Sequence, residues 1–336
     1  MDAYTLKADR YENLSEGWFR RCGRSGLVLP AISLGIWQNF GDPGTGTGHH
    51  QDEKAFHENS KQMIFTAFDC GITHIDAANI YGPPKGKAEE RLGQIIKQLP
   101  RNELVVSTKA GVNMWPGPYG RAGSRKHILT SLDESLKRLD LDFVDIYYHH
   151  CPDPDAPLEE TLGAYDQAVR SGKALHFGVS NYSGALTAEA IRIIDRDRLA
   201  PLLVHQPSYS MLNRGIETDL FKTARHAGFG MACFSPLGKG RLSSRFLGES
   251  KGPSRVDPAT IDEPMRTKLG RLNDHAVQRG QSLPQMALAW VLRNPCVTTA
   301  LIGASRPEQI RENAAVLDHA DFTEDELQQI DKILAS

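Results

Sequence analysis

Short apolar runs rich in β-branched residues alternate along the chain with longer segments in which apolar residues recur at helical spacing. Near-continuous apolarity over a short run is typical of parallel strands that are covered on both faces. Eight runs have this character, and we predict each of them as a strand. They are residues 29–34, 72–76, 104–108, 143–148, 174–179, 202–205, 230–234 and 299–302.

The segments between these runs carry the signals of helices. Gly71, Gly172 and Gly228 stand where a glycine ends a helix, and Ser124 precedes a helical run. Thr323 opens the last run with Glu326 three residues later, which is a capping box. The predicted helices are residues 53–70, 87–98, 125–139, 158–171, 184–195, 216–226, 283–293, 307–317 and 323–334.

Eight strands that alternate strictly with helices predict an α/β fold of the (β/α)8 TIM-barrel type rather than a doubly wound sheet. We expect one domain over residues 1–336, with an N-terminal extension at residues 1–18 and a small hairpin at residues 20–28 that plugs one end of the barrel. Residues 111–123 and the long region 237–281 are expected as loops on the face where the strands end, which is where barrels build their sites.

Composition and charge exclude several classes of protein. The 336 residues include 39 Lys and Arg against 41 Asp and Glu, for a net charge of −2. This balance argues against a nucleic-acid platform or a polybasic membrane anchor. No apolar stretch approaches the length of a membrane span, and the five cysteines are scattered without a C-x-x-C pair. We therefore expect a reduced, cytoplasmic protein with no disulfide framework, no metal site, and no nucleic-acid or membrane partner.

Polar residues stand at the ends of three successive predicted strands. Asp76 ends the second strand and Tyr81 follows it, Lys109 ends the third, and the pair His149 and His150 ends the fourth. In a barrel these ends converge on one mouth. A lysine beside a tyrosine favours the phenolate, and a carboxylate keeps the lysine charged and oriented. The phenol could then act as a general acid toward a developing alkoxide, while a neutral imidazole orients the carbonyl oxygen.

Each of these residues also has an ordinary structural explanation. Asp76 could cap the end of its strand, and Tyr81 could pack on the turn that follows it. One of His149 and His150 is expected to be only structural, because adjacent strand residues point to opposite faces. Lys109 is harder to explain in this way, since lysine is rarely buried without a partner.

From about Phe19 to the final helix, the sequence resembles the aldo-keto reductases. The catalytic tetrad of that family corresponds to Asp76, Tyr81, Lys109 and His150. The histidine is assigned to His150 because the family pattern is aspartate-hydrophobic-tyrosine-x-x-histidine, which residues 145–150 fit.

The resemblance also implies a nicotinamide dinucleotide cofactor, with NADPH expected and NAD(H) less favoured. The family binds it without a Rossmann fingerprint, and no G-x-G-x-x-G occurs here. Phe234 would stack on the nicotinamide, Ser180 and Asn181 would hold its carboxamide, and the segment around residues 301–313 would bind the adenosine end. The implied cofactor residues are Gly35, Trp37, Asp76, Ser180, Asn181, Gln206, Phe234, Ser235, Pro236, Leu237, Lys239, Arg255, Gly303, Ser305, Gln309, Glu312 and Asn313.

Within the family, residues 81–89, 114–120 and 172–175 resemble the bacterial L-glyceraldehyde 3-phosphate reductases, a branch related to the β subunits of voltage-gated potassium channels. That branch implies NADPH-dependent reduction of small aldehydes such as L-glyceraldehyde 3-phosphate and methylglyoxal. It also implies a substrate pocket, with Arg121 or Arg125 at a substrate phosphate. The pocket residues would be Trp37, Tyr81, Trp115, Tyr119 and His150.

Two other functions remain open at this point. The first is a regulatory subunit that binds NADPH and acts through a partner protein with little turnover. The second is a barrel aldolase in which Lys109 forms a Schiff base. A homo-oligomer also remains open.

Overall fold

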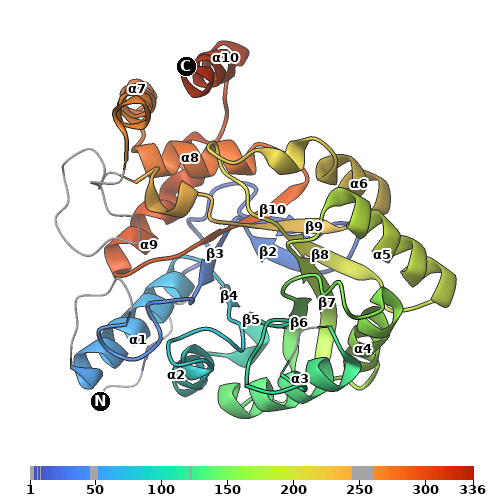
Figure 1. The fold of residues 1–336 in the computed structure, drawn as a ribbon. Coiled ribbons are helices and arrows are strands. Elements are labelled where there is room, and N and C mark those ends of the chain that lie inside the picture. The colour runs from blue at the N-terminus through green and yellow to red at the C-terminus, as the bar shows by residue number, and fades with distance from the viewer. Residues whose placement is uncertain (1–3, 6, 8, 46–51, 121–122, 244–260) are drawn as a thin grey trace.

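A computed structural model describes residues 4–5, 7, 9–45, 52–120, 123–243 and 261–336. Its centre is a closed barrel of parallel strands, which confirms the predicted (β/α)8 architecture (Figure 1). The barrel closes where the first and last of its strands pair with each other. In order around the barrel, the strands are β3 (Ile32–Gly35), β4 (His74–Asp76), β5 (Val105–Ala110), β6 (Val144–His149), β7 (Ala174–Ser180), β8 (Leu202–Gln206), β9 (Gly230–Phe234) and β10 (Val297–Ile302).

Helices surround the strands and bury their apolar faces against them (Figure 1). Most begin where the sequence predicts, because side-chain caps define their starts: Ser124 accepts from the backbone of His127, and Thr323 forms the expected capping box. The helices are α1 (Glu53–Asp69), α2 (Lys87–Ile96), α3 (Arg125–Leu139), α4 (Leu158–Arg170), α5 (Gly184–Asp197), α6 (Leu220–Ala227), α7 (Glu263–Gln278), α8 (Leu283–Leu292), α9 (Pro307–Ala314) and α10 (Glu324–Ala335).

A hairpin closes the end of the barrel at which the strands begin. Strand β1 (Phe19–Arg21) pairs antiparallel with β2 (Val28–Pro30). Cys22 and Leu29 are fully buried against residues of β6, β8 and β9. The predicted strand 29–34 is therefore two strands, β2 and β3. The division falls at Ala31, whose N–H donates to the carbonyl of Trp18, directly before β1, while its own carbonyl accepts from Ala300 in the barrel.

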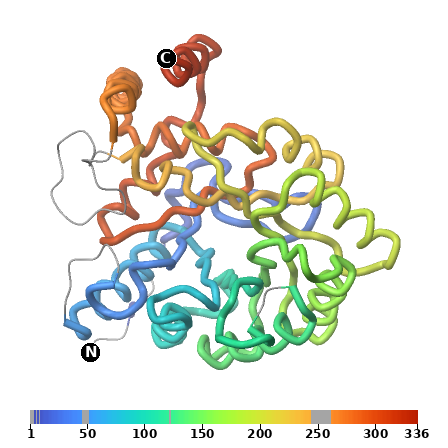
Figure 2. The backbone as a smooth tube through the Cα atoms, in the orientation of Figure 1, coloured from blue at the N-terminus to red at the C-terminus, as the bar shows by residue number. Residues whose placement is uncertain are grey.

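The prediction that residues 237–281 form only a loop was wrong for its second part, where α7 lies. Asp262 caps this helix, and Leu269, Leu272 and Ala276 form its buried stripe. The stripe is narrow because most of the other residues of the helix are charged or polar, and this obscured the helical spacing in the sequence. Helix α7 lies beside the C-terminal helix α10 (Figure 2), and Lys268 donates to the carbonyl of Leu334 across that contact.

No helix in the described ranges is both long enough and apolar enough to cross a bilayer.

Candidate active site

The strand order and the turns that follow the strands bring all four predicted residues to the same mouth of the barrel. Asp76 lies level with Ser107 on β5, and Lys109 follows two residues later on that strand, facing the same side. Tyr81 is carried by a turn after β4, in which its N–H donates to Ala78. His150 follows β6, and its N–H donates to Ala110 at the end of β5. The tetrad residues therefore come from three neighbouring strand ends, as the sequence predicted.

Lys109 is the centre of this arrangement. Its side chain is completely buried, and its ammonium group donates to the carboxylate of Asp76, to the carbonyl oxygen of Ala77 at 2.7 Å and to the phenol oxygen of Tyr81 at 3.1 Å. Three acceptors for three ammonium hydrogens leave none unsatisfied. The buried charge is thus fully paired and fixed in position.

The carboxylate of Asp76 is held from two further directions. Ser107 donates its hydroxyl to Oδ1 at 2.6 Å, and the amide of Gln206 donates to the same oxygen at 3.1 Å. Oδ2 faces Lys109. Asp76 is therefore not merely a strand-end cap, because its oxygens are taken up by side chains of β5 and β8.

The charge states of the site follow from burial and from these contacts. Burial raises the pKa of Tyr81, and the ammonium of Lys109 only partly offsets that rise. From the sequence, Lys109 was expected to lower the pKa of Tyr81. Burial of the phenol raises this pKa by more than the lysine lowers it. Burial disfavours the charged form of Lys109, but the attraction of Asp76 and Tyr81 outweighs it and raises the lysine's pKa. At neutral pH the phenol therefore keeps its proton and the lysine its charge.

The two adjacent histidines have different surroundings. His150 faces Tyr81, with 6.0 Å between ring centres, and burial followed by repulsion from Lys109 lowers its pKa to about 3. His149 instead points toward the helices, where its Nδ1 lies 2.7 Å from the hydroxyl of Tyr182 and its ring packs on Tyr165. The expectation that one of the pair is structural holds for His149, and a neutral imidazole at His150 borders the site.

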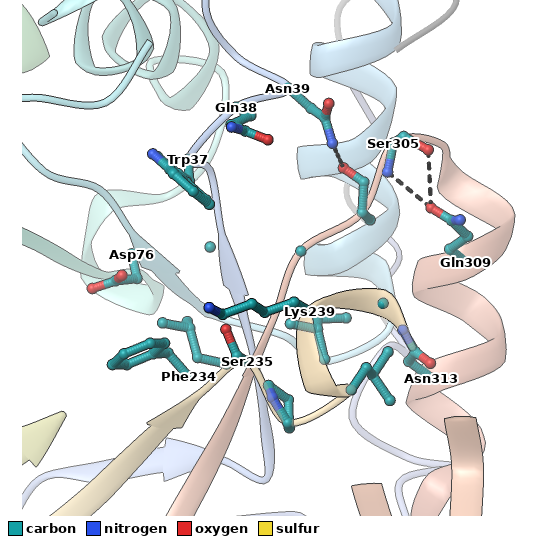
Figure 3. A pocket seen from close by; sticks show the side chains of 18 of the residues that line it. Trp37, Gln38, Asn39, Asp76, Phe234, Ser235, Lys239, Ser305, Gln309 and Asn313 are labelled. Atoms are coloured by element: carbon teal, nitrogen blue, oxygen red, sulfur yellow. Dashed lines mark hydrogen bonds between the residues drawn. The ribbon is translucent and has the colours of Figure 1, made fainter. Parts of the chain in front are cut away.

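A cleft of about 540 Å³ runs from the tetrad to the start of α9. Every predicted cofactor residue that the structure describes lines it, whereas Arg255 falls outside the described residues. Lys239 lies across the middle of the cleft, between Asp76 at one end and Ser305 and Asn313 at the other (Figure 3).

Three lining residues have left-handed backbone without being glycine. These are Asn181, Ser235 and Lys239, with φ of 60°, 54° and 61°. Such conformations cost on the order of 1–3 kcal/mol and cluster at ligand-binding sites. At Asn181 the amide side chain contributes to the compensation, because it donates to the carbonyl of His150 at 2.9 Å and thereby ties the end of β7 to that of β6.

The far end of the cleft is fixed by amide side chains. Gln309 accepts from the backbone N–H and from the hydroxyl of Ser305, and Asn39 donates to the carbonyl of Ala304 at 2.7 Å (Figure 3). One oxygen of Glu312 accepts from Ser282, the cap of α8. Helix α9 begins at Pro307 beside these residues, so its N-terminal amides border the cleft.

The structure does not bring the predicted substrate loop to this cleft. Trp115 packs against His127 at the start of α3, with 5.2 Å between ring centres, and Tyr119 is largely exposed. Neither is among the lining residues, whereas Trp37 is. Arg121 falls outside the described residues, and the guanidinium of Arg125 is bonded to Gln167 of α4.

Several side chains that line the cleft were not predicted as site residues, among them Gln38, Asn39, Ile80, Ser243 and Arg306. Arg306 had a usable signal, because it stands directly before Pro307, the first residue of a helix, where an anion would be favoured. Gln38 and Asn39 follow β3 in a connection whose path the sequence pattern does not define.

Within the described ranges, no group of three or more His, Cys, Asp and Glu side chains is arranged to hold a metal ion.

The chain is similar to known proteins over most of its length. The family model described as "Aldo/keto reductase family" matches residues 31–335. The chain is similar to the L-glyceraldehyde 3-phosphate reductase of Escherichia coli strain K12, at 44% identity over 96% of this chain and 94% of that protein. It is also similar to a putative voltage-gated potassium channel subunit beta of Schizosaccharomyces pombe, at 35% identity over 94% and 93%, and to a probable one of Arabidopsis thaliana, at 34% over 89% and 91%.

Proposed function

Because the chain belongs to the aldo-keto reductase family and is therefore an oxidoreductase, we propose that it reduces small aldehydes with NADPH and that Tyr81 is the general acid. L-Glyceraldehyde 3-phosphate and methylglyoxal are the proposed substrates. The observation that carries the proposal is the buried Lys109 ammonium, which is bonded at once to Asp76 and to the phenol of Tyr81 at the end of the cleft.

The reaction needs a hydride at the carbonyl carbon and a proton at the carbonyl oxygen. A nicotinamide dinucleotide held by the residues of the cleft would supply the hydride. Tyr81 supplies the proton, since its raised pKa keeps the phenol protonated at neutral pH. The C=O double bond becomes a C–O single bond, the phenol O–H breaks, and the product is an alcohol.

Lys109 and Asp76 make this proton transfer easier. When the phenol loses its proton, the negative oxygen remains 3.1 Å from a fixed ammonium group. Because Lys109 is fully buried, this attraction is stronger than it would be in water. Asp76 keeps the ammonium pointed at the phenol and cannot itself approach the substrate, since its oxygens face Lys109, Ser107 and Gln206.

His150 has the role of orienting the carbonyl oxygen. Its pKa of about 3 makes the ring neutral at pH 7, so it carries one N–H. Nδ1 is buried without a hydrogen-bond partner among the described residues, and a proton there would be an unsatisfied buried donor. The N–H therefore belongs on Nε2, as a hydrogen-bond donor for the carbonyl beside Tyr81.

The lining of the cleft fits a dinucleotide. Ser180, Asn181 and Gln206 offer amide and hydroxyl groups to a carboxamide, and Phe234 offers an aromatic face beside them. Lys239 in the middle suits a pyrophosphate, and Arg306 at the start of α9 suits a further phosphate. Aldo-keto reductases generally use NAD(P)H, and the cation at Arg306 is what favours NADPH in this proposal.

The test is NADPH consumption with L-glyceraldehyde 3-phosphate and with methylglyoxal, comparing the wild-type protein with Tyr81→Phe. We expect turnover that falls by about 10²–10⁴-fold when the acid is removed. Fluorescence titration of NADPH serves as the control, because Phe keeps the ring and should keep binding. Turnover that survives in Tyr81→Phe would remove Tyr81 from the acid role.

A second candidate function is a regulatory subunit that binds NADPH and acts through a partner protein. It is favoured by the relatives of 34–35% identity that are named as potassium channel β subunits. Tight NADPH binding by the wild-type protein without turnover of either aldehyde would support it.

A further inference from the structure

Below the site, the interior of the barrel contains a continuous line of buried polar side chains. Thr299 of β10, Ser33 of β3, His74 of β4 and Ser107 of β5 are all fully buried. We call these four residues the polar column. Barrel interiors are normally filled by layers of branched apolar residues. A polar line in that position therefore needs an account.

The members of the column are joined at hydrogen-bonding distance. Thr299 Oγ1 lies 2.6 Å from Ser33 Oγ, and Ser33 Oγ lies 2.8 Å from Nδ1 of His74. Nε2 of His74 lies 3.0 Å from Ser107 Oγ, which donates to Asp76. The line therefore runs from β10 to the carboxylate that holds Lys109.

The donor of each bond can be derived from the carboxylate end. Asp76 only accepts, so the single hydroxyl hydrogen of Ser107 is used on it, and His74 must donate from Nε2 to Ser107. Burial lowers the pKa of His74 to about 4, so the ring is neutral at pH 7 and its Nδ1 accepts from Ser33. Ser33 has then used its hydrogen, so the hydroxyl hydrogen of Thr299 is shared between Ser33 at 2.6 Å and the carbonyl of Ala31 at 3.3 Å. The other three donors all point toward Asp76.

We propose that His74 is a positioning residue: as the Nε2–H tautomer, fixed by Ser33, it aims the Ser107 hydroxyl at Asp76 and so holds the carboxylate against Lys109. This proposal rests on the proposed function, since it assigns His74 a role in the proton transfer from Tyr81. His74 itself borders neither the cleft nor the phenol.

The groups that face Lys109 define what a disturbed column would change. They are Asp76 of β4, Tyr81 of the following turn, Tyr148 of β6 and His150. The attraction of Asp76 is the largest contribution that raises the pKa of Lys109. A carboxylate that is free to turn away would weaken it, and the alkaline limit of turnover would move to lower pH.

The test compares two amide replacements of His74. In Gln the terminal nitrogen reaches the position of Nε2 and can still donate to Ser107, whereas in Asn the amide reaches only the Nδ1 side. We expect His74→Gln to keep kcat within about threefold and His74→Asn to lose about tenfold, because the Ser107 hydroxyl then lacks the donor that aims it at the buried carboxylate of Asp76. The KM for NADPH should not change in either. Only His74→Asn should move the alkaline limit of kcat to lower pH, by about half a unit or more.

A second variant acts without touching the histidine. Ser33→Ala removes one of the two contacts that fix the tautomer, the other being the bond to Ser107. ¹⁵N NMR of the His74 ring should therefore show an Nε2–H tautomer in the wild-type protein and a smaller Nε2–H fraction in Ser33→Ala. The matched control is Ser131→Ala, which removes the hydroxyl from another buried serine–histidine pair, with His127 at 3.4 Å. It should leave both the His74 tautomer and the pH profile unchanged.

Each outcome is decisive. An Nδ1–H tautomer in the wild-type protein overturns the proposal, and so do equal kcat values and equal pH profiles for the Asn and Gln variants. If the His74 variants do not fold, Ser33→Ala decides alone: a wild-type tautomer with a wild-type pH profile overturns the proposal. A wild-type protein without turnover refutes the proposed function instead, because the tautomer can still be measured.

Discussion

Replacing Lys109 by Met separates the structural role of the buried ion pair from its chemical role. The change keeps a side chain of similar length but leaves the ionised Asp76 fully buried, with Ser107 and Gln206 as its remaining side-chain donors. The carbonyl of Ala77 also loses the donor it has at 2.7 Å. The variant therefore contains an uncompensated charge where the wild-type protein has a paired one.

The size of the effect follows from that imbalance. Removing one partner of a buried ion pair typically costs about 3–5 kcal/mol, whereas replacing both partners by neutral groups is often close to neutral. We therefore expect Lys109→Met to lose about 3 kcal/mol of unfolding free energy or more. The double variant Asp76→Asn with Lys109→Met should recover most of it, with a coupling of at least about 2 kcal/mol between the two positions.

Urea unfolding at pH 7 measures the stabilities, and NADPH consumption measures the chemistry. Turnover should stay at least about 10²-fold low in the double variant, because stability returns there but the ammonium beside Tyr81 does not. Losses that simply add, or a loss below about 1 kcal/mol for Lys109→Met alone, would refute the view that the pair is dry and tightly coupled. Recovered turnover in the double variant would refute the role of the ammonium.

Three further predictions concern the cleft, the buried histidines and the substrate loop. Arg306→Met should raise the Kd of NADPH about tenfold and leave that of NADH within about twofold in fluorescence titrations; equal weakening of both would contradict a phosphate role. Burial lowers the pKa values of His74 and His205 to about 4 and that of His150 to about 3, from 6.5, so the unfolded chain takes up protons first as the pH falls. The stability that comes from keeping these histidines neutral is complete above about pH 6.5 and declines as the pH falls toward the folded pKa values. At pH 5 each histidine should lower the free energy of unfolding, measured with urea, by on the order of 2 kcal/mol. His205→Asn should make the free energy of unfolding depend less steeply on pH. Trp115→Ala should change the KM for L-glyceraldehyde 3-phosphate by less than about threefold. A larger rise would indicate that the loop of residues 111–123 contacts the substrate.

Much of the architecture could be read from the sequence because local signals agree with the overall fold. Parallel strands in a barrel put their ends at one mouth, so Asp76 and Lys109 could be placed together without coordinates. Capping residues such as Ser124 gave helix starts directly. Helix α7 was missed because its buried stripe is narrow. It also breaks the alternation of one strand with one helix, since α7 and α8 both lie between β9 and β10.

Other properties depend on packing that no periodicity encodes. The path of a loop decides that Trp115 packs on His127 and does not line the cleft, whereas its expected pocket role came only from the resemblance to a branch of the family. The net direction of the Tyr81 pKa depends on how deeply the ring is buried. No pattern in the sequence singled out His74 and Ser107, because the sequence does not show that the imidazole of one and the hydroxyl of the other are hydrogen-bonded inside the barrel.

The closure of the barrel also bears on when this protein can first work as it is made on the ribosome. Strand β3 ends at Gly35, but the strand that completes its pairing, β10, begins only at Val297. Asp76 and Lys109 leave the ribosome early, but the barrel around them cannot close until β10 has been made. By then nearly nine-tenths of the sequence has been translated. The charged centre is thus among the earlier parts to be synthesised and among the last to be enclosed.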